Sequence, residues 1–161
     1  MIGRYKRKWI EQVASKNKAS FLQWQATHLP TATNESAYTV VSFSGAKWFA
    51  DQLYSLYSYY SNVGKPKQWL IYNDGTYSEI HLQVLRKIER VTVCDFDLSL
   101  ARLPQVALQK FPTLKKVEII AKHVSDEKIM ITDSDILFYK QFNAYVKSYQ
   151  SANYFLVDEG S

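Results

Sequence analysis

The stretch that decides the fold is Lys128-Ile129-Met130-Ile131-Thr132-Asp133-Ser134-Asp135-Ile136-Leu137-Phe138, a short apolar run that ends on two acids one residue apart. The run from Ile129 to Ile131 is apolar without alternation, which is typical of a parallel strand covered on both faces. If the backbone stays extended through Asp133 and Asp135, the two-residue period of a strand sends both carboxylates to the same side. We therefore predict a buried strand whose carboxyl end carries a pair of acids.

These two carboxylates suit a hard divalent cation. Mg²⁺ and Mn²⁺ prefer oxygen ligands and complete their coordination with water and with phosphate oxygens of a substrate. A cation held by Asp133 and Asp135 would retain a diphosphate that the acids alone would repel. The alternative is a polar strand end followed by a turn, and the tripeptide by itself leaves both interpretations open.

Segments with strand character alternate with segments of helical periodicity along the rest of the chain. Strands are predicted over 38–44, 68–72, 91–94 and 153–157, and helices over 48–60, 98–111 (broken near Pro104), 113–123 and 141–150. A further helix is expected after the capping-box spacing of Thr76 and Glu79. The inward positions expected of the 113–123 helix are Leu114, Val117, Ile120 and Ala121. This alternation predicts βαβ units and an α/β fold with a mostly parallel sheet flanked by helices.

Polar side chains follow the predicted strands, at the edge where such sheets bind ligands. In chain order, the strand ends are Ser44-Gly45, Asn73-Asp74-Gly75, Asp95 and Asp133-Ser134-Asp135. A single Asp in such a place is common as a turn residue. An acidic rim along one edge of the sheet fits a cation-assisted phosphate site.

Asp133-Ser134-Asp135, in this strand context, resembles the DXD signature of nucleotide-sugar-dependent glycosyltransferases of the GT-A fold, a Rossmann-like fold. Ile71-Tyr72-Asn73-Asp74-Gly75-Thr76 resembles the strand-to-helix turn in which an Asp of these enzymes contacts the nucleotide base. Val41-Ser42-Phe43-Ser44 is similar to their first strand, whose end lines the base and ribose pocket. The resemblance covers about residues 38 to 158, the donor-binding half of that fold.

The resemblance implies a role for each matching residue. Asp133 and Asp135 would hold Mn²⁺ or Mg²⁺ against the donor's diphosphate, and Ser134 would lie near the ribose. The residues expected to contact the donor are Phe43, Ser44, Asp74, Lys122 and Ser134. Lys122 lies on the preceding helix, where many members carry a cation that reaches the acids or the diphosphate. Lys122 is equally well interpreted as a cation that complements a helix C-terminus, and Asp74 as a plain turn residue.

The activity implied is transfer of a sugar from a nucleoside-diphosphate sugar to an acceptor hydroxyl. The acceptor half of the fold has no counterpart before Ser161, so we expect an incomplete GT-A-like domain over 38–161, preceded by a basic helical extension over 1–37. No catalytic base or nucleophile is assigned. Two alternatives remain open: a phosphatase-type hydrolase with Asp133 as nucleophile and Asp135 as acid–base, and a non-catalytic nucleotide-sugar-binding fragment.

Composition and charge bound these interpretations. The 161 residues suffice for one domain with a core, and the net charge of +5 lies entirely in residues 1–18, which hold six Lys or Arg and one Glu. Such a segment predicts peripheral contact with an anionic membrane, whereas the balanced remainder offers no basic stripe for nucleic acid. The single cysteine, Cys94, and the absence of an apolar signal segment predict a cytoplasmic protein. No Gly-x-Gly-x-x-Gly or Walker loop occurs, which excludes the common dinucleotide and P-loop sites.

Overall fold

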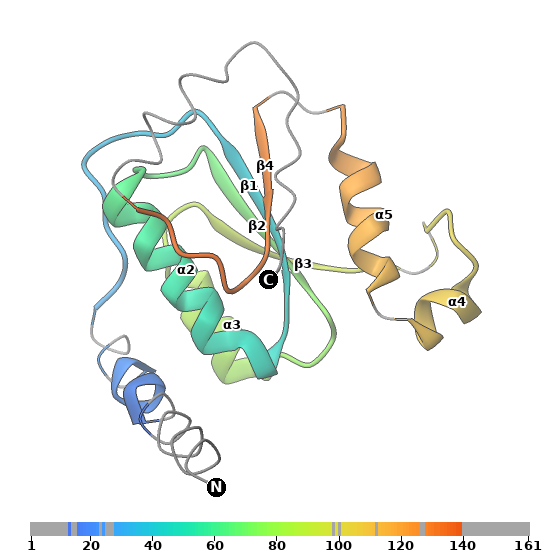
Figure 1. Ribbon diagram of the computed structural model, residues 1–161, viewed down its shortest axis with the longest axis horizontal. Coiled ribbons are helices and arrows are strands. Elements are labelled where there is room, and N and C mark those ends of the chain that lie inside the picture. Colours follow the sequence, from blue (N-terminus) through green and yellow to red (C-terminus); the bar gives the residue numbers. More distant parts are fainter. Residues whose placement is uncertain are drawn as a thin grey trace, which may run out of the picture.

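The computed structural model describes residues 13, 16–22, 24, 28–97, 99, 101–111, 113–125 and 128–139. Its centre is a four-stranded, all-parallel sheet in the order β3-β2-β1-β4 (Figure 1). The strands are β1 (Thr39–Ser44), β2 (Gln68–Asn73), β3 (Val91–Asp95) and β4 (Ile129–Thr132). The helices are η1 (Ala46–Trp48), α2 (Phe49–Asn62), α3 (Glu79–Arg86), α4 (Gln105–Lys110) and α5 (Leu114–His123). The predicted α/β fold with a parallel sheet flanked by helices is confirmed, whereas the helix at 141–150 and the strand at 153–157 lie outside the described residues.

The order of the strands reverses next to β1. The chain runs outward from β1 to β2 and β3, and then crosses back to place β4 on the other side of β1. Ser44 of β1 lies opposite Asn73 of β2, and Ser42 lies opposite Thr132 of β4. Open parallel sheets bind ligands outside the carboxyl ends of their strands at such a reversal. The topology alone therefore predicts a ligand site at the carboxyl ends of β1 and β4.

Helices cover both faces of the sheet. On one face, Val40, Trp69 and Ile71 pack in a single buried cluster with Leu53 of α2 and Leu85 of α3. On the other face, a smaller cluster joins Val41 of β1 and Tyr72 of β2 to Ile119 of α5. Burial on both faces explains why the strands are apolar without strict alternation.

Two helices differ in detail from their predicted form. The N-cap of α3 is Ser78, whose capping box is completed by His81 and not by Thr76 and Glu79. Val117 of α5 was expected to face inward, but its side chain is 52% exposed. The buried face of α5 carries Glu118, Ile119 and His123 instead. Polar groups are tolerated there because each has a partner: Glu118 accepts from the Leu103 amide, and His123 is hydrogen-bonded to the Tyr72 hydroxyl at 2.9 Å.

The strand before the acids ends earlier than an extended backbone would require. β4 stops at Thr132, and Ser134 and Asp135 lie in a turn. The condition that the chain stays extended through Asp135 is therefore wrong. The turn, and not a two-residue strand period, sets the directions of the two carboxylates.

Helical residues 16–22 precede the sheet and contact α2. The ring of Phe21 stacks on that of Tyr54 with centroids 3.8 Å apart, and Lys18 forms an ion pair with Asp51 at 2.7 Å. Most of the basic 1–18 segment lies outside the described residues. Within the part of the chain that is described, no helix is both long and apolar enough to cross a membrane.

Candidate functional site

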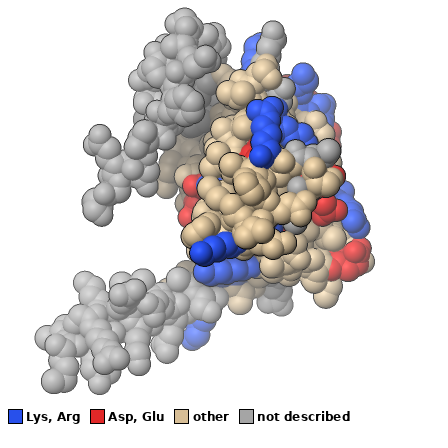
Figure 2. Space-filling model, turned by 90° about the vertical axis from the view of Figure 1, so that its right-hand side faces the viewer, with Lys and Arg blue, Asp and Glu red and all other residues tan. Residues whose placement is uncertain are grey.

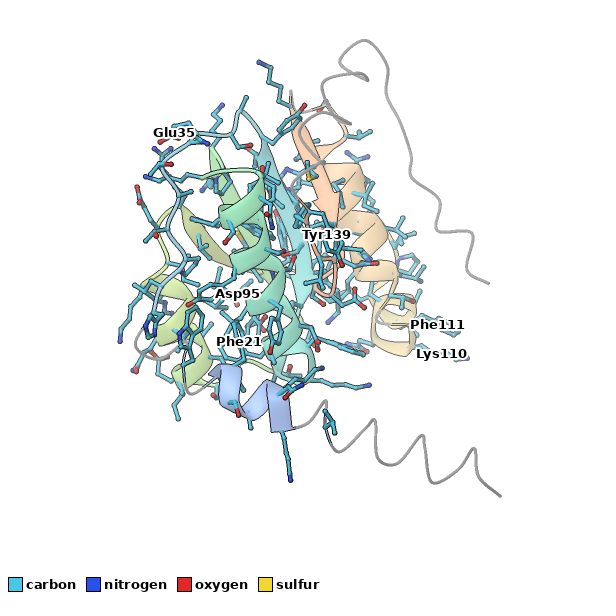
Figure 3. All side chains as sticks on the ribbon, turned by 60° about the vertical axis from the view of Figure 1, so that its left-hand side comes forward. Phe21, Glu35, Asp95, Lys110, Phe111 and Tyr139 are labelled. Atoms are coloured by element: carbon cyan, nitrogen blue, oxygen red, sulfur yellow. The ribbon has the colours of Figure 1, made fainter. Side chains whose placement is uncertain are left out.

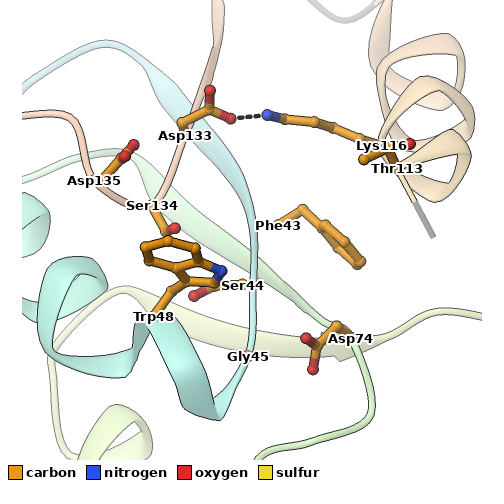
Figure 4. Close-up of a pocket in the computed structure, with 10 residues that line it drawn as sticks. All are labelled: Phe43, Ser44, Gly45, Trp48, Asp74, Thr113, Lys116, Asp133, Ser134 and Asp135. Atoms are coloured by element: carbon orange, nitrogen blue, oxygen red, sulfur yellow. Dashed lines mark ion pairs between the residues drawn. The ribbon is translucent and has the colours of Figure 1, made fainter.

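A pocket opens at the carboxyl ends of β1 and β4, where the strand order reverses (Figure 4). Four segments contribute to it: the end of β1 with η1, the β2–α3 turn, the start of α5, and the turn after β4. Its lining residues are Phe43, Ser44, Gly45, Trp48, Asp74, Thr113, Lys116, Asp133, Ser134 and Asp135. Of the residues predicted to form the site, the structure brings together Phe43, Ser44, Asp74, Asp133, Ser134 and Asp135. Lys122 is not among the lining residues.

The turn after β4 presents both acids to the pocket. Asp133 and Asp135 are exposed, whereas Ser134 between them is only 8% exposed. Figure 4 shows the Ser134 side chain directed toward Trp48, away from the two carboxylates. Asp133 forms an ion pair with Lys116. Within the described part of the chain, Asp135 has no ion-pair partner, so the two carboxylates differ in their charge environment.

Lys116 is a pocket residue that the sequence analysis missed. It is the third residue of α5, and its ammonium group is directed at Asp133 (Figure 4). Partial burial lowers the pKa of Lys116, and the nearby Asp135 carboxylate acts in the opposite direction. The predicted cation, Lys122, instead lies over the ring of Tyr72, with 5.4 Å between its ammonium nitrogen and the ring centroid.

The direction of α5 explains which lysine reaches the pocket. A helix that connects parallel strands runs antiparallel to them, so its first turn lies at the carboxyl edge of the sheet. Lys116 is in that first turn, whereas Lys122 is in the last turn. The predicted topology therefore already favoured a lysine at the start of the crossover helix, such as Lys116, over one at its end.

Asp74 ties the ends of β1 and β2 together. Its backbone amide donates to the Ser44 carbonyl at 2.9 Å, and its Oδ1 accepts from the Thr76 amide and hydroxyl at 2.9 and 2.6 Å. The Thr76 hydroxyl in turn accepts from the Ala46 amide at 2.8 Å. Asp74 thus has the hydrogen bonds of a turn residue and also lines the pocket, so the two interpretations of this residue are compatible.

Gly45 leaves the space that the Asp74 carboxylate occupies. A Cβ atom at Gly45 would lie 2.1 Å from both carboxylate oxygens of Asp74. The backbone of Gly45 is extended, with φ −156°, so glycine is required here by close approach and not by its conformational freedom. The pair Ser44-Gly45 predicted the end of this strand, but the sequence did not show why the second residue is glycine.

Trp48 supplies an aromatic surface at the pocket. Its side chain is 43% exposed. The ammonium of Lys47 lies 4.6 Å from the centroid of its ring. Deeper in this region Ser44 is 2% exposed, and burial raises the pKa of the neighbouring Tyr77 to about 12. An exposed indole beside polar groups is suited to pack on a planar base or on the apolar face of a sugar.

The turn Asp133-Ser134-Asp135, here called the acid turn, fits a divalent cation that is shared with a ligand. Within the described residues, no three His, Cys, Asp or Glu side chains are grouped so that they hold a metal by themselves. Asp133 and Asp135 offer at most two protein carboxylates. Mg²⁺ is commonly bound in this way, by one or two carboxylates with the remaining positions taken by water and substrate phosphates. The donor set is therefore appropriate to a metal that binds together with a diphosphate.

The chain matches no protein-family model, and a comparison with curated proteins found no significant relative.

Proposed function

We propose that this chain is the donor-binding part of a GT-A glycosyltransferase, which transfers a sugar from a nucleoside-diphosphate sugar to an acceptor hydroxyl. One observation carries the proposal: both acids of the Asp133-Ser134-Asp135 turn line a pocket at the strand-order reversal, together with a lysine and an exposed tryptophan. A nucleoside-diphosphate sugar has the matching parts, namely a planar base, a hydroxylated ring and two phosphates.

Each part of the pocket has a chemical task in this proposal. Asp133 and Asp135 hold Mn²⁺ or Mg²⁺. The bound metal supplies Lewis-acid stabilisation of the negative charge on the departing nucleoside diphosphate. Lys116 neutralises Asp133 in the absence of donor and offers an ammonium group to the phosphates when donor is present.

The organic parts of the donor have candidate partners on the other side of the pocket. Trp48 and Phe43 offer aromatic surface for the base or the sugar ring. Ser44, Ser134 and Asp74 provide hydroxyl and carboxylate oxygens near them. These polar groups sit at strand ends and in hydrogen-bonded turns, which hold their positions before a ligand binds.

The pocket lining itself holds three carboxylates and one ammonium group, whereas the helices beside the pocket carry an excess of positive charge. Figure 2 views the molecule from the side of α4 and α5 and shows Lys and Arg side chains distributed over this face. The two helices carry Lys110, Lys115, Lys116 and Lys122, against Glu118 alone. Positive charge beside a cleft raises the rate at which an anion reaches it, and salt screens this effect.

Titration calorimetry with UDP and GDP tests the proposal. We expect saturable binding in the presence of Mn²⁺ and loss of binding in EDTA. Asp95→Asn is a matched control, because Asp95 ends β3 but does not line the pocket. Equal affinity with and without metal would contradict the role given to the acid turn. Metal-dependent hydrolysis of p-nitrophenyl phosphate, without nucleotide binding, would favour the phosphatase alternative.

A further inference from the structure

A second groove lies at the amino edge of the sheet, opposite the donor pocket. Three of its lining residues directly precede or lead into strands: Lys67 comes before β2, Arg90 before β3 and Lys128 before β4. The other lining residues are Glu35, Ser36 and Ala37. Figure 3 shows Glu35 at the upper end of the molecule and Asp95, the last residue of β3, well below it.

The groove carries an excess of positive charge. Its lining has three cations and one acid. Arg90 lies 3.7 Å from the Glu35 carboxylate and donates to the Lys67 carbonyl at 3.3 Å. Within the described part of the chain, Lys67 and Lys128 form no ion pair. Two ammonium groups are therefore available to a ligand, beside a guanidinium that its neighbours hold in place.

Arg90 and Lys128 also share an unusual backbone conformation. They are the two non-glycine residues with positive φ in the described chain, at 65° and 52°. This left-handed region is unfavourable for a residue with a Cβ atom and is readily adopted by glycine. Both positions are fixed by the sheet, because the Trp69 amide donates to the Arg90 carbonyl at 2.7 Å and the Thr39 amide to the Lys128 carbonyl at 3.0 Å.

The sequence thus places long cationic side chains where glycine would be more stable, and it does so twice in one groove. Retained backbone strain of this kind points to function, because the surrounding structure must compensate for it. The two strained cations converge with Lys67 from the start of a third strand. Three separately anchored cations match an anion with several oxygens and more than one negative charge.

We propose that this groove is a binding site for a small phosphate-bearing anion, with Lys67, Arg90 and Lys128 as its ligands. The site is distinct from the donor pocket, since the two lie at opposite edges of the sheet. It needs no divalent metal, because the three cations themselves supply the positive charge. Its affinity falls as salt concentration rises, since the groove is open to solvent.

Inorganic pyrophosphate in EDTA is the probe, because removal of divalent cations leaves the acid turn without a means to hold it. We expect saturable binding by calorimetry and a higher melting temperature with pyrophosphate. Lys67→Gln should weaken binding by about tenfold, because it removes a hydrogen bond to a charged group. Its melting temperature without pyrophosphate should be unchanged, since Lys67 is exposed.

Lys128→Gly gives the sharper test, because its two expected effects have opposite signs. Relief of the left-handed backbone should raise the melting temperature without ligand by about 2–4 °C. Loss of the ammonium group should weaken pyrophosphate binding by about tenfold. A variant that is more stable and binds less cannot have lost affinity through unfolding.

Two further variants complete the design. Lys110→Gln removes an exposed lysine at the end of α4, outside both pockets, and should leave binding and stability unchanged. Lys116→Gln alters the donor pocket and should also leave pyrophosphate binding unchanged. Absence of saturable binding, parental affinity in Lys67→Gln and Lys128→Gly, or weakened binding in Lys116→Gln alone would each overturn the proposal.

Discussion

Lys116 and Asp133 form an ion pair that joins the first turn of α5 to the residue directly after β4. The pair leaves the second acid of the turn, Asp135, without an ion-pair partner in the described chain. A cation that enters the pocket therefore meets one carboxylate that is available and one that is already neutralised. Because the two carboxylates differ in this way, substitution of Asp135 and substitution of Lys116 should change metal binding differently.

Asp135→Asn should abolish metal-dependent binding of nucleotide and leave the fold unchanged. Asparagine keeps the shape of the side chain but loses the charge that a hard cation requires. Asp135 is exposed, so the substitution opens no cavity. Thermal melting with UDP and Mn²⁺ measures the effect, and Asp95→Asn is the control. A variant that Mn²⁺ and UDP still stabilise as they do the parent would show that Asp135 is not a metal ligand.

Lys116→Gln should strengthen the binding of Mn²⁺ in the absence of nucleotide, because it frees Asp133 from a competing cation. The pair is partly exposed, so we expect a change of about threefold to fivefold, or ~1 kcal/mol or less. The same variant should weaken the binding of UDP at saturating Mn²⁺, since an ammonium group is lost from the phosphate site. Lys115→Gln is the matched control, because Lys115 lies over the Phe96 ring and does not line the pocket. Weaker binding of Mn²⁺ by Lys116→Gln would contradict this account.

Gly45→Ala should destabilise the protein and impair the pocket together. The new methyl group would overlap the Asp74 carboxylate, which two hydrogen bonds to Thr76 hold in place. We expect a loss of about 1–3 kcal/mol in the free energy of unfolding, as for other overpacked sites. Gly75→Ala provides the contrast: it meets nothing within 4 Å, but its φ of +97° disfavours alanine. Urea denaturation should show both losses, with weaker UDP binding expected for Gly45→Ala.

The free energy of unfolding should decline as the pH rises from about 10 toward 12. Burial raises the pKa of Tyr77 to about 12 from its ordinary value of 10.0. Between these values the unfolded chain loses the phenolic proton while the folded protein keeps it, so stability present below pH 10 is lost as the pH rises through the folded pKa. The contribution of Tyr77 is up to about 2–3 kcal/mol.

Urea denaturation at a series of pH values measures this decline. Tyr77→Phe should make it shallower, because the variant has no phenol to titrate at this position. Tyr139→Phe is the matched control, since Tyr139 is 71% exposed. An identical pH dependence in the parent and in Tyr77→Phe would contradict the assignment.

The strands and their order of appearance were predictable because apolar β-branched runs and polar strand ends are local signals. Which face of each helix is buried was less predictable. In α5, apolar residues at 114, 117, 119, 120 and 121 surround much of the helix, so the pattern does not fix which side is buried. Its orientation is set by Glu118 and His123, which find partners in Leu103 and Tyr72, far away in the sequence. The periodicity of apolar residues cannot predict such partners.

The candidate site shows the same division between local and tertiary information. Asp133 and Asp74 were found because each directly follows a strand, and Asp135 because it lies two residues beyond Asp133. The parallel sheet brings these strand ends together. Lys116 and Trp48 were missed because their positions depend on the direction of α5 and on the short η1 turn. The capping box was misplaced by two residues, since the Thr76 hydroxyl is hydrogen-bonded to Asp74 and Ala46 and does not cap α3.

The acid turn follows the shortest of the described strands, and the length of this strand affects the dynamics of the site. β4 has four residues, and among the described strands it pairs only with β1, whereas β2 has six residues and a neighbour on each side. Strands with few partners open locally at a lower free energy than the global unfolding transition. Backbone amides of Ile129 to Thr132 should therefore exchange with solvent deuterium before those of Trp69 to Tyr72. Each such opening separates Asp133 from Lys116 while the rest of the sheet stays folded, so a ligand that bridges the acid turn and α5 would slow exchange in β4 most of all.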